Sequence, residues 1–410
     1  GLAAFALGYA AADEGLWVDE LHTSWVVSAS LDELAVRAAA GNQTAWYFYL
    51  IFGFRQFLWT VGEQFSVGWL TEELMLRLPS ISAWSLTAGL VAVILLRRSA
   101  RNPFSLSTHK SPAWPYYLWL SLPIAGWCLC MVLDRIQWFY GVEARVYSMV
   151  QLLNVLGWLI VLSVYSGYTG KGKRSERPCK GKKAPHWNGL NCCSCLGSWS
   201  CLGWSVIAIA LINLHITSLP SVLTQLVTLC VLAVMQPKIR VSLLLSILLF
   251  TLVGWFTVSE LQPIWDRRTQ WQSVGGNANL TSLLNLLPIL PTLVPVTVAW
   301  IIVYLAVRLG FRRENSSRFF ALATNQVGLW ALAFWVPYLS AWMMAWLEIA
   351  PLFHYRFVIT ASVPLYLFTG SWLLQLPWLW LRWMAVLVSI VWVAHSQGSL
   401  SNWQRGKLLS

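Results

Sequence analysis

The sequence is poor in charge. Only 11% of its 410 residues are Asp, Glu, Lys or Arg, whereas a soluble globular domain carries about 25%. This scarcity excludes a water-exposed surface over most of the chain. The formal net charge of +12 does not indicate nucleic-acid binding, because the Lys and Arg residues sit in short loops between apolar runs. We therefore expect no nucleic-acid partner.

Two further features are lacking, an evenly spread set of cysteines and an internal repeat. The chain has eight Cys, of which five cluster in or beside one basic loop, at Cys179, Cys192, Cys193, Cys195 and Cys201. This clustering excludes the disulfide framework of a small secreted domain. The missing repeat disfavours a transporter, since transporters usually contain one.

Apolar residues make up 57% of the chain, and 28 of its residues are Trp, which favours the membrane interface. A spanning helix needs about 20 apolar residues. Residues 1–12 are read as the outer end of a first helix, with a cleaved signal peptide as the alternative. With this segment, the runs predict an all-α bundle of about eleven transmembrane helices. The other runs are 76–96, 115–133, 146–166, 199–214, 219–236, 241–259, 289–308, 319–345, 357–376 and 378–395.

The distribution of charge predicts the orientation of the bundle. If the helices alternate, the loops near 97–114, 167–188, 237–240 and 308–318 share one side and hold most of the 28 Lys and Arg. Positively charged loops face the cytoplasm. We therefore expect a cytoplasmic N-terminus and most of the acidic residues on the outer side. The absence of an organellar signal favours a bacterial inner membrane.

The first outer loop, residues 13–75, is much longer than a connection requires, and long loops are usually functional. Its aromatic segment 44–62 contains Arg55, and a span here would place the basic loop after residue 96 outside. We therefore predict an interfacial or re-entrant helix for this segment. Residues 1–395 form the transmembrane module, and residues 396–410 begin a short outer C-terminal segment.

Ionisable side chains recur at the outer turns. Charged groups at membrane depth are costly and usually face a cavity or a partner, so one shared cleft is the functional interpretation. Solvated loop acids, boundary charges that reach water and interfacial anchors are the alternatives. The candidates are Asp19, Glu20, Glu143, Arg145, Tyr147, His215, His354 and Arg356, with Glu260, Asp266, Arg267 and Arg268 in a further outer loop.

Carboxylates and guanidinium groups at an apolar, Trp-rich surface suit one kind of substrate. A carboxylate can act as a general base on an acceptor hydroxyl, and an Arg fork binds phosphate oxygens. A lipid phosphate with a polar head offers both targets. Asp19 and Glu143 could also hold a divalent cation, Mg²⁺ or Mn²⁺, and the sequence leaves this alternative open.

The order of these groups resembles the GT-C superfamily of membrane glycosyltransferases, in particular the protein-mannosyltransferase and aminoarabinose-transferase type. The resemblance covers nearly the whole chain. It rests on Leu16-Trp17-Val18-Asp19-Glu20 followed by Leu76-Arg77-Leu78-Pro79-Ser80, on Tyr140-Gly141-Val142-Glu143-Ala144-Arg145-Val146-Tyr147, on His354-Tyr355-Arg356-Phe357, and on Asn402-Trp403-Gln404-Arg405.

This resemblance implies an enzyme that transfers a sugar, with inversion, from a polyprenyl-phosphate donor to a glycan, lipid or protein acceptor on the outer face. It implies that Asp19 is the catalytic base, with Glu20 beside it. The donor phosphate would lie on Arg145 and Arg356. The acceptor or a metal would be oriented by Glu143, Tyr147, His215 and His354.

One departure from the family pattern concerns the first loop. Many members contain a His-Pro-Pro or Lys-Pro stretch where this chain has Asn42-Gln43-Thr44-Ala45-Trp46, so acceptor contacts from this loop are in question. Two rival functions stay open, a membrane transporter or lipid flippase and a non-catalytic scaffold with the same fold.

Overall fold

The computed structural model describes residues 1–12, 15–41, 43–65, 71–100, 114–171, 193–266, 278–287, 289–294, 296–298, 301–302, 316–374, 376 and 379–396. All regular structure within these ranges is helical, and no strand occurs in them. The all-α prediction is therefore confirmed for the described part of the chain.

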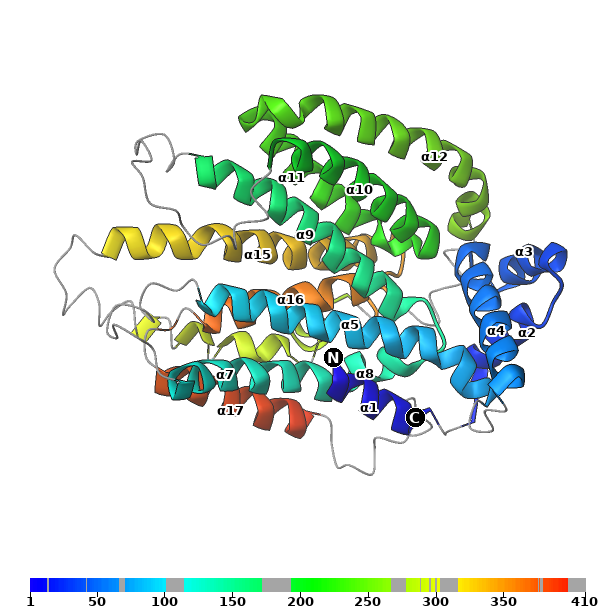
Figure 1. Cartoon of the computed structure of the whole chain (residues 1–410), viewed down its shortest axis with the longest axis horizontal. Helices are drawn as coiled ribbons and strands as arrows, with labels where there is room; N and C mark the ends of the chain where they lie inside the picture. The colour runs from blue at the N-terminus through cyan, green and yellow to red at the C-terminus, as the bar shows by residue number, and fades with distance from the viewer. Residues whose placement is uncertain are drawn as a thin grey trace.

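Long helices run side by side along the long axis of the molecule (Figure 1). Each of them overlaps a run that the sequence predicts as a span. They are α5 (Glu72–Ala100), α7 (Trp114–Leu133), α9 (Tyr147–Lys171), α10 (Cys193–Leu214), α11 (Leu219–Met235), α12 (Arg240–Asp266), α15 (Ser316–Trp346), α16 (Ile359–Leu373) and α17 (Leu379–Ser396), and the shorter α1 (Leu2–Ala11) lies against α5.

Five described segments are long and apolar enough to cross a membrane, so the chain is an integral membrane protein. They are Glu72–Ser99, Tyr147–Ser166, Ile216–Met235, Pro237–Thr257 and Val327–Trp346. Shorter apolar helices cover Ser121–Leu133, Ser200–Leu214 and Leu379–His395. The number of about eleven spans stays a prediction. Residues 295, 299–300 and 303–308 of the expected span 289–308, and residues 397–410, lie outside the described residues.

Three helices of the first loop lie across one end of the bundle (Figure 1). They are α2 (Val18–Val27), α3 (Leu31–Ala40) and α4 (Ala45–Phe65). Helix α4 buries Tyr47, Phe48 and Ile51 but exposes Trp46 and Phe57. This two-sided character fits a helix at an interface, and the interfacial position itself stays a prediction.

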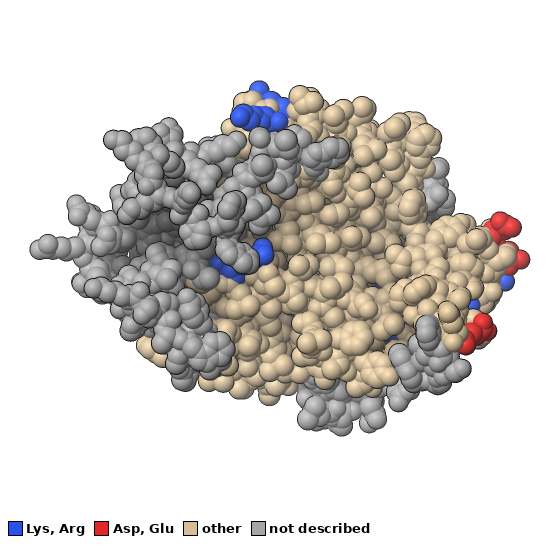
Figure 2. Space-filling model, in the orientation of Figure 1, with Lys and Arg blue, Asp and Glu red and all other residues tan. Residues whose placement is uncertain are grey.

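Exposed acidic residues gather at one end of the molecule, where Arg37 and Arg55 are partly exposed beside them. Acidic residues gather over α2–α4, at the right of Figure 2, while Lys and Arg appear where α11 turns into α12. The exposed residues at these places include Asp32 and Glu33 on α3, and Lys238 and Arg240 in the turn. Arg97 lies in the last turn of α5, far from the first-loop end. This distribution agrees with the predicted pattern, and the assignment of one end to the cytoplasm stays a prediction.

Close helix packing next to the site depends on Gly141 in α8 (Arg135–Val142). A Cβ atom at this position would lie 2.5 Å from Cδ2 of Trp84, which is fully buried in α5. We expect Gly141→Ala to destabilise the protein by about 1–3 kcal/mol, because the indole must leave its packed position. Thermal unfolding in detergent measures this effect.

Gly53→Ala is the matched control for this substitution. Gly53 is also helical, in α4, but nothing lies within 4 Å of its Cβ position. Alanine favours a helix over glycine by about 0.5–1 kcal/mol, so this variant should be neutral or slightly more stable. Equal effects of the two substitutions would contradict the packing argument.

Candidate functional site

The candidate site lies where several helix ends meet at the first-loop end of the bundle. The start of α5, the turn between α8 and α9, the 3-10 turn η1 (Ile216–Ser218) and the segment before α16 all reach this region. Helix α2 closes it from the side of the first loop. Polar side chains can gather here because the apolar spans end at this level.

A buried ion pair forms the base of the site. Oε1 and Oε2 of Glu20 lie 2.9 Å from Nε and 2.6 Å from Nη2 of Arg77, and both side chains are fully buried. Arg77 also donates to the backbone oxygens of Ala12 and Gly15. Glu20 also accepts the N–H of Ala144 at 2.9 Å. Glu20 is thus fully engaged in holding three segments together, which favours a structural role over the predicted catalytic one.

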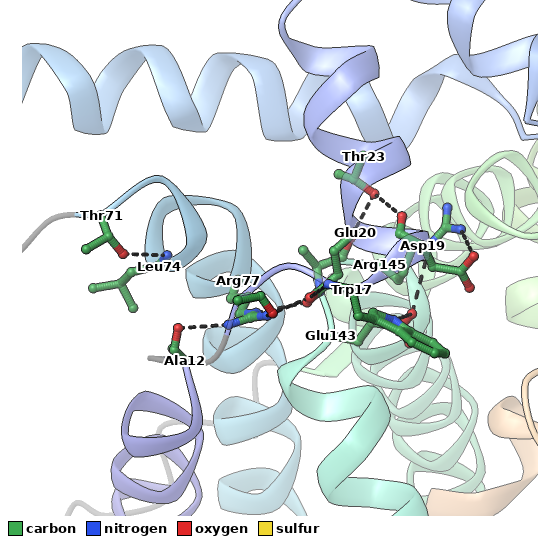
Figure 3. A network of polar contacts seen from close by, with 12 residues as sticks. Ala12, Trp17, Asp19, Glu20, Thr23, Thr71, Leu74, Arg77, Glu143 and Arg145 are labelled. Atoms are coloured by element: carbon green, nitrogen blue, oxygen red, sulfur yellow. Dashed lines mark hydrogen bonds and ion pairs between the residues drawn. The ribbon is translucent and has the colours of Figure 1, made fainter. Parts of the chain in front are cut away.

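A second polar group lies beside this pair and is more open to solvent. Arg145 Nη2 contacts Asp19 Oδ1 at 3.0 Å, and Arg145 Nε lies 4.0 Å from Glu143 Oε1. The indole N–H of Trp17 donates to the same Glu143 oxygen at 3.2 Å. Figure 3 shows Trp17, Asp19, Glu143 and Arg145 converging from α2 and from the turn before α9. The Asp19 side chain is 28% exposed, so this carboxylate can be reached from outside.

Several buried polar atoms in this group have no hydrogen-bond partner among the described residues. They are Oε2 of Glu143, Nε and Nη1 of Arg145, and Nε of Arg356. Buried polar groups in folded proteins almost always have partners, so each exception needs an explanation. Unused guanidinium N–H groups beside an unused carboxyl oxygen indicate a binding site for an anionic group or for ordered water.

Aromatic contacts bring the remaining predicted residues to the same place. The ring centroid of His215 lies 5.6 Å from that of Tyr147 and 6.3 Å from that of Phe357. His354 lies 6.2 Å from Phe357 by the same measure. Arg356 is close enough for the charges of Asp19 and Glu143 to act on it. The structure therefore places all the predicted principal candidates around one region.

Burial changes the protonation of several of these groups. It raises the pKa of Glu143 to about 7, because desolvation outweighs the attraction of the nearby Arg145 guanidinium. Desolvation and the positive charge of Arg356 lower the pKa values of His215 and His354 to about 4. The two imidazoles are thus neutral at pH 7, while Glu143 changes its charge near neutrality.

The raised pKa of Glu143 has a consequence for stability. Its pKa is above the ordinary value of 4.5, so the folded state favours the protonated form. The stability that the protonated Glu143 carboxyl contributes is fully present below about pH 4.5 and is lost as the pH rises through about 7. Glu143→Gln mimics the protonated carboxyl at every pH. We expect the variant to gain stability relative to wild type by roughly 3 kcal/mol between pH 5 and pH 8.

Thermal unfolding of both proteins across this pH range measures the difference. Glu33→Gln is the control, because Glu33 is exposed and pairs with Arg37 one helical turn away. The difference in stability between Glu33→Gln and wild type should change little with pH. A pH-independent difference between wild type and Glu143→Gln would show that the Glu143 carboxyl is charged in the folded protein throughout the range.

The arrangement of charges does not favour a divalent cation between Asp19 and Glu143. The guanidinium of Arg145 contacts one carboxylate and lies within ion-pair range of the other, so it already supplies the positive charge there. The possible divalent cation stays a prediction.

The polar groups of this site come from segments that lie far apart in the chain, and the residue numbers of Trp17 and Glu143 differ by 126. No family model, curated protein or solved structure matches the chain. The function therefore has to be argued from the residues of the site.

Two important contacts were not expected from the sequence. Arg77 and Trp17 occur in the quoted motifs, but no role was predicted for either. An arginine at the start of an apolar run needs a buried partner, and this signal could have identified Arg77. Of the other outer-loop candidates, Asp266 is exposed at the end of α12. The side chain of Glu260, together with Arg267 and Arg268, lies outside the described residues.

Proposed function

We propose that this protein is an integral membrane glycosyltransferase. It transfers a sugar from a polyprenyl-phosphate donor to an acceptor glycan, lipid or protein at the first-loop end of the bundle. The observation that supports this best is the set of unused N–H groups on Arg145 and Arg356 beside two carboxylates. The family resemblance of the motifs around Asp19, Glu143 and Arg356 points to the same activity.

In this proposal the two guanidinium groups bind the donor phosphate. Planar guanidinium groups match phosphate oxygens in geometry and charge, and burial strengthens the interaction. The surrounding helices expose apolar faces that can contact the prenyl chain. Polyprenyl phosphate leaves with the electron pair of its bond to the anomeric carbon, and the arginines stabilise its charge.

Asp19 is the proposed general base. Its carboxylate is the more exposed of the two near Arg145, so an acceptor hydroxyl can approach it. The acceptor oxygen forms the new bond to the anomeric carbon while its proton passes to Asp19. Glu143 is oriented by Trp17 and Arg145, and Tyr147, His215 and His354 lie beside the proposed donor site. Neutral imidazoles suit this position because they can bind hydroxyls without adding charge.

Transport is the rival function, and buried amides inside the bundle bear on it. Asn154 of α9 binds Gln225 and Ser221 of α11, and Gln151 binds Ser362 of α16. These groups bind one another, as polar contacts that join helices do, while Oε1 of Gln151 is buried without a partner among the described residues. Most of these polar atoms are thus occupied, whereas a transport site near the membrane centre would require polar groups free to bind the cargo. The balance of these contacts favours the enzyme.

We also propose a bacterial inner membrane as the location, with the N-terminus in the cytoplasm and the site on the outer face. The charge distribution of the bundle supports this orientation. Cysteine-accessibility labelling of exposed Asp32→Cys and Lys238→Cys variants in intact cells tests it. The first should react with an impermeant reagent and the second should not.

The decisive experiment measures release of polyprenyl phosphate from a labelled polyprenyl-phosphate sugar by the purified protein. It is run with and without an acceptor extract, and with and without a chelator. Acceptor-dependent release by wild type supports the proposal, and its loss on chelation would reveal a metal requirement. If well-folded wild type neither binds nor converts a panel of such donors, transport or a scaffold role replaces the enzyme.

A further inference from the structure

Trp17 occupies an unusual position for a tryptophan of a membrane protein. Its indole N–H donates to Glu143 Oε1 at 3.2 Å, and its ring meets that of Phe139 edge to face, with centroids 5.7 Å apart. Its backbone N–H is bound by Glu20 at 3.3 Å, immediately before α2. Both the backbone and the ring are therefore held in place, while the side chain stays partly exposed.

Two other tryptophans of the first loop are more exposed than Trp17. Trp46 on α4 is 50% exposed, and Trp25 on α2 is 47% exposed. Both lie on outward faces, as expected for indoles that meet lipid headgroups. Trp17 instead faces the polar group of Asp19, Glu143 and Arg145 (Figure 3). A pre-ordered aromatic ring in a polar site costs little entropy when it binds a ligand.

We propose that Trp17 is the sugar-binding residue that makes the site prefer a glycosylated lipid phosphate over the bare lipid phosphate. This inference rests on the proposed function. The sugar is attached directly to the phosphate, so a phosphate on Arg145 places the sugar next to the residues that contact Arg145. Glu143 is one of these residues, and it holds the indole of Trp17.

The chemistry of an indole suits one face of a sugar ring. The C–H groups of that face carry partial positive charge and pack on the negative face of an aromatic ring. The neighbouring carboxyl of Glu143 keeps one oxygen without a partner, which can bind a sugar hydroxyl. The indole of Trp17 and the free carboxyl oxygen of Glu143 can therefore bind a sugar together, the indole at the apolar face of the sugar ring and the carboxyl at a hydroxyl on its edge.

Equilibrium binding to the full-length protein in detergent tests the inference without requiring turnover. A fluorescent polyprenyl phosphate is displaced by a polyprenyl-phosphate hexose or pentose, and separately by unlabelled polyprenyl phosphate of the same chain length. The measured quantity is the ratio of the two affinities. We expect Trp17→Leu to reduce the preference for the sugar-bearing lipid roughly 10-fold, with little change for the bare lipid phosphate.

Two other variants control the result. Trp17→Phe keeps an aromatic face and should retain most of the preference, whereas Trp46→Leu removes an exposed indole and should retain all of it. Thermal unfolding shows whether Trp17→Leu is folded. If it is not, the test rests on Trp17→Phe, for which we expect a smaller loss of the preference for the sugar-bearing lipid.

The outcomes separate the inference from the proposed function. An unchanged affinity ratio in folded Trp17→Leu, or an equal loss for both lipids, would overturn the sugar-binding role of Trp17. Failure of wild type to bind either lipid would overturn the proposed function, and the inference with it. Binding of both lipids by wild type, with selective loss in Trp17→Leu, supports both.

Discussion

Asp19→Asn is expected to bind the polyprenyl-phosphate donor as tightly as wild type and to transfer its sugar at least about 100-fold more slowly. The amide cannot accept the proton of the acceptor hydroxyl, so the step that requires a base is lost. Its oxygen can still accept the contact that Arg145 Nη2 makes with Asp19 Oδ1 at 3.0 Å. Removing the negative charge also leaves Arg145 more available to phosphate.

The measurement compares the transfer rate with the equilibrium affinity for the donor. Asp32→Asn is the control, since Asp32 is an exposed acid in the first turn of α3. It should change neither quantity. Normal transfer by Asp19→Asn would exclude Asp19 as the base and direct attention to Glu143. Equal loss of binding and transfer would instead give Asp19 a structural role.

Arg77→Met is expected to be the most destabilising single substitution in the site. Its partner Glu20 would remain fully buried without its counter-charge, and breaking a buried ion pair in this way costs about 3–5 kcal/mol. The backbone oxygens of Ala12 and Gly15 would lose a donor as well. We expect low yields of folded protein and a markedly lower unfolding temperature.

Arg55→Met is the matched control, because Arg55 pairs with Glu72 at 3.4 Å in a more exposed position. Exposed pairs contribute about 0–1 kcal/mol, so this variant should behave almost like wild type. The double variant Arg77→Met with Glu20→Gln should recover part of the loss, because the neutral amide needs no counter-charge. Strictly additive losses would contradict direct coupling between the two side chains.

Apolar length and charge were sufficient to predict most long helices. The start of α7 at Trp114 and the end of α11 at Met235 lie within one residue of the expected bounds. Helix α4 was also expected, because aromatic residues surround Arg55 in a segment of helical length. The sequence patterns did not predict the ends of α5 correctly. This helix begins at Glu72 and ends at Ala100, four residues beyond each predicted bound, and it contains Pro79 in its interior, where proline removes one backbone hydrogen bond.

The sequence predicted that the candidate site residues would gather at one end of the bundle, but it did not predict their contacts, and their roles stay a prediction. Costly charges at the outer turns identified Asp19, Glu143, Arg145 and Arg356, because such groups must gather where lipid ends. The sequence predicts similar catalytic roles for the adjacent residues Asp19 and Glu20. In the structure their side chains point to different partners. Successive side chains of a helix leave it about 100° apart. The tertiary structure decides which of the two is buried, because Glu20 faces Arg77 of α5.

Glu20 also determines how the site can move. Its carboxylate binds the N–H of Ala144, and Thr23 donates its hydroxyl to the oxygen of the same residue at 3.0 Å. The beginning of α2 is thereby fastened to the turn before α9 at two points, and these parts must travel as one rigid body. Any opening that admits a long prenyl chain has to take place elsewhere. Helix α4 is also held to the bundle at several points, by the Thr44 hydroxyl on the backbone oxygen of Asn213, by the pair of Arg55 with Glu72 and by the buried side chains of Tyr47, Phe48 and Ile51. A prenyl chain that entered there would therefore have to displace a packed helix.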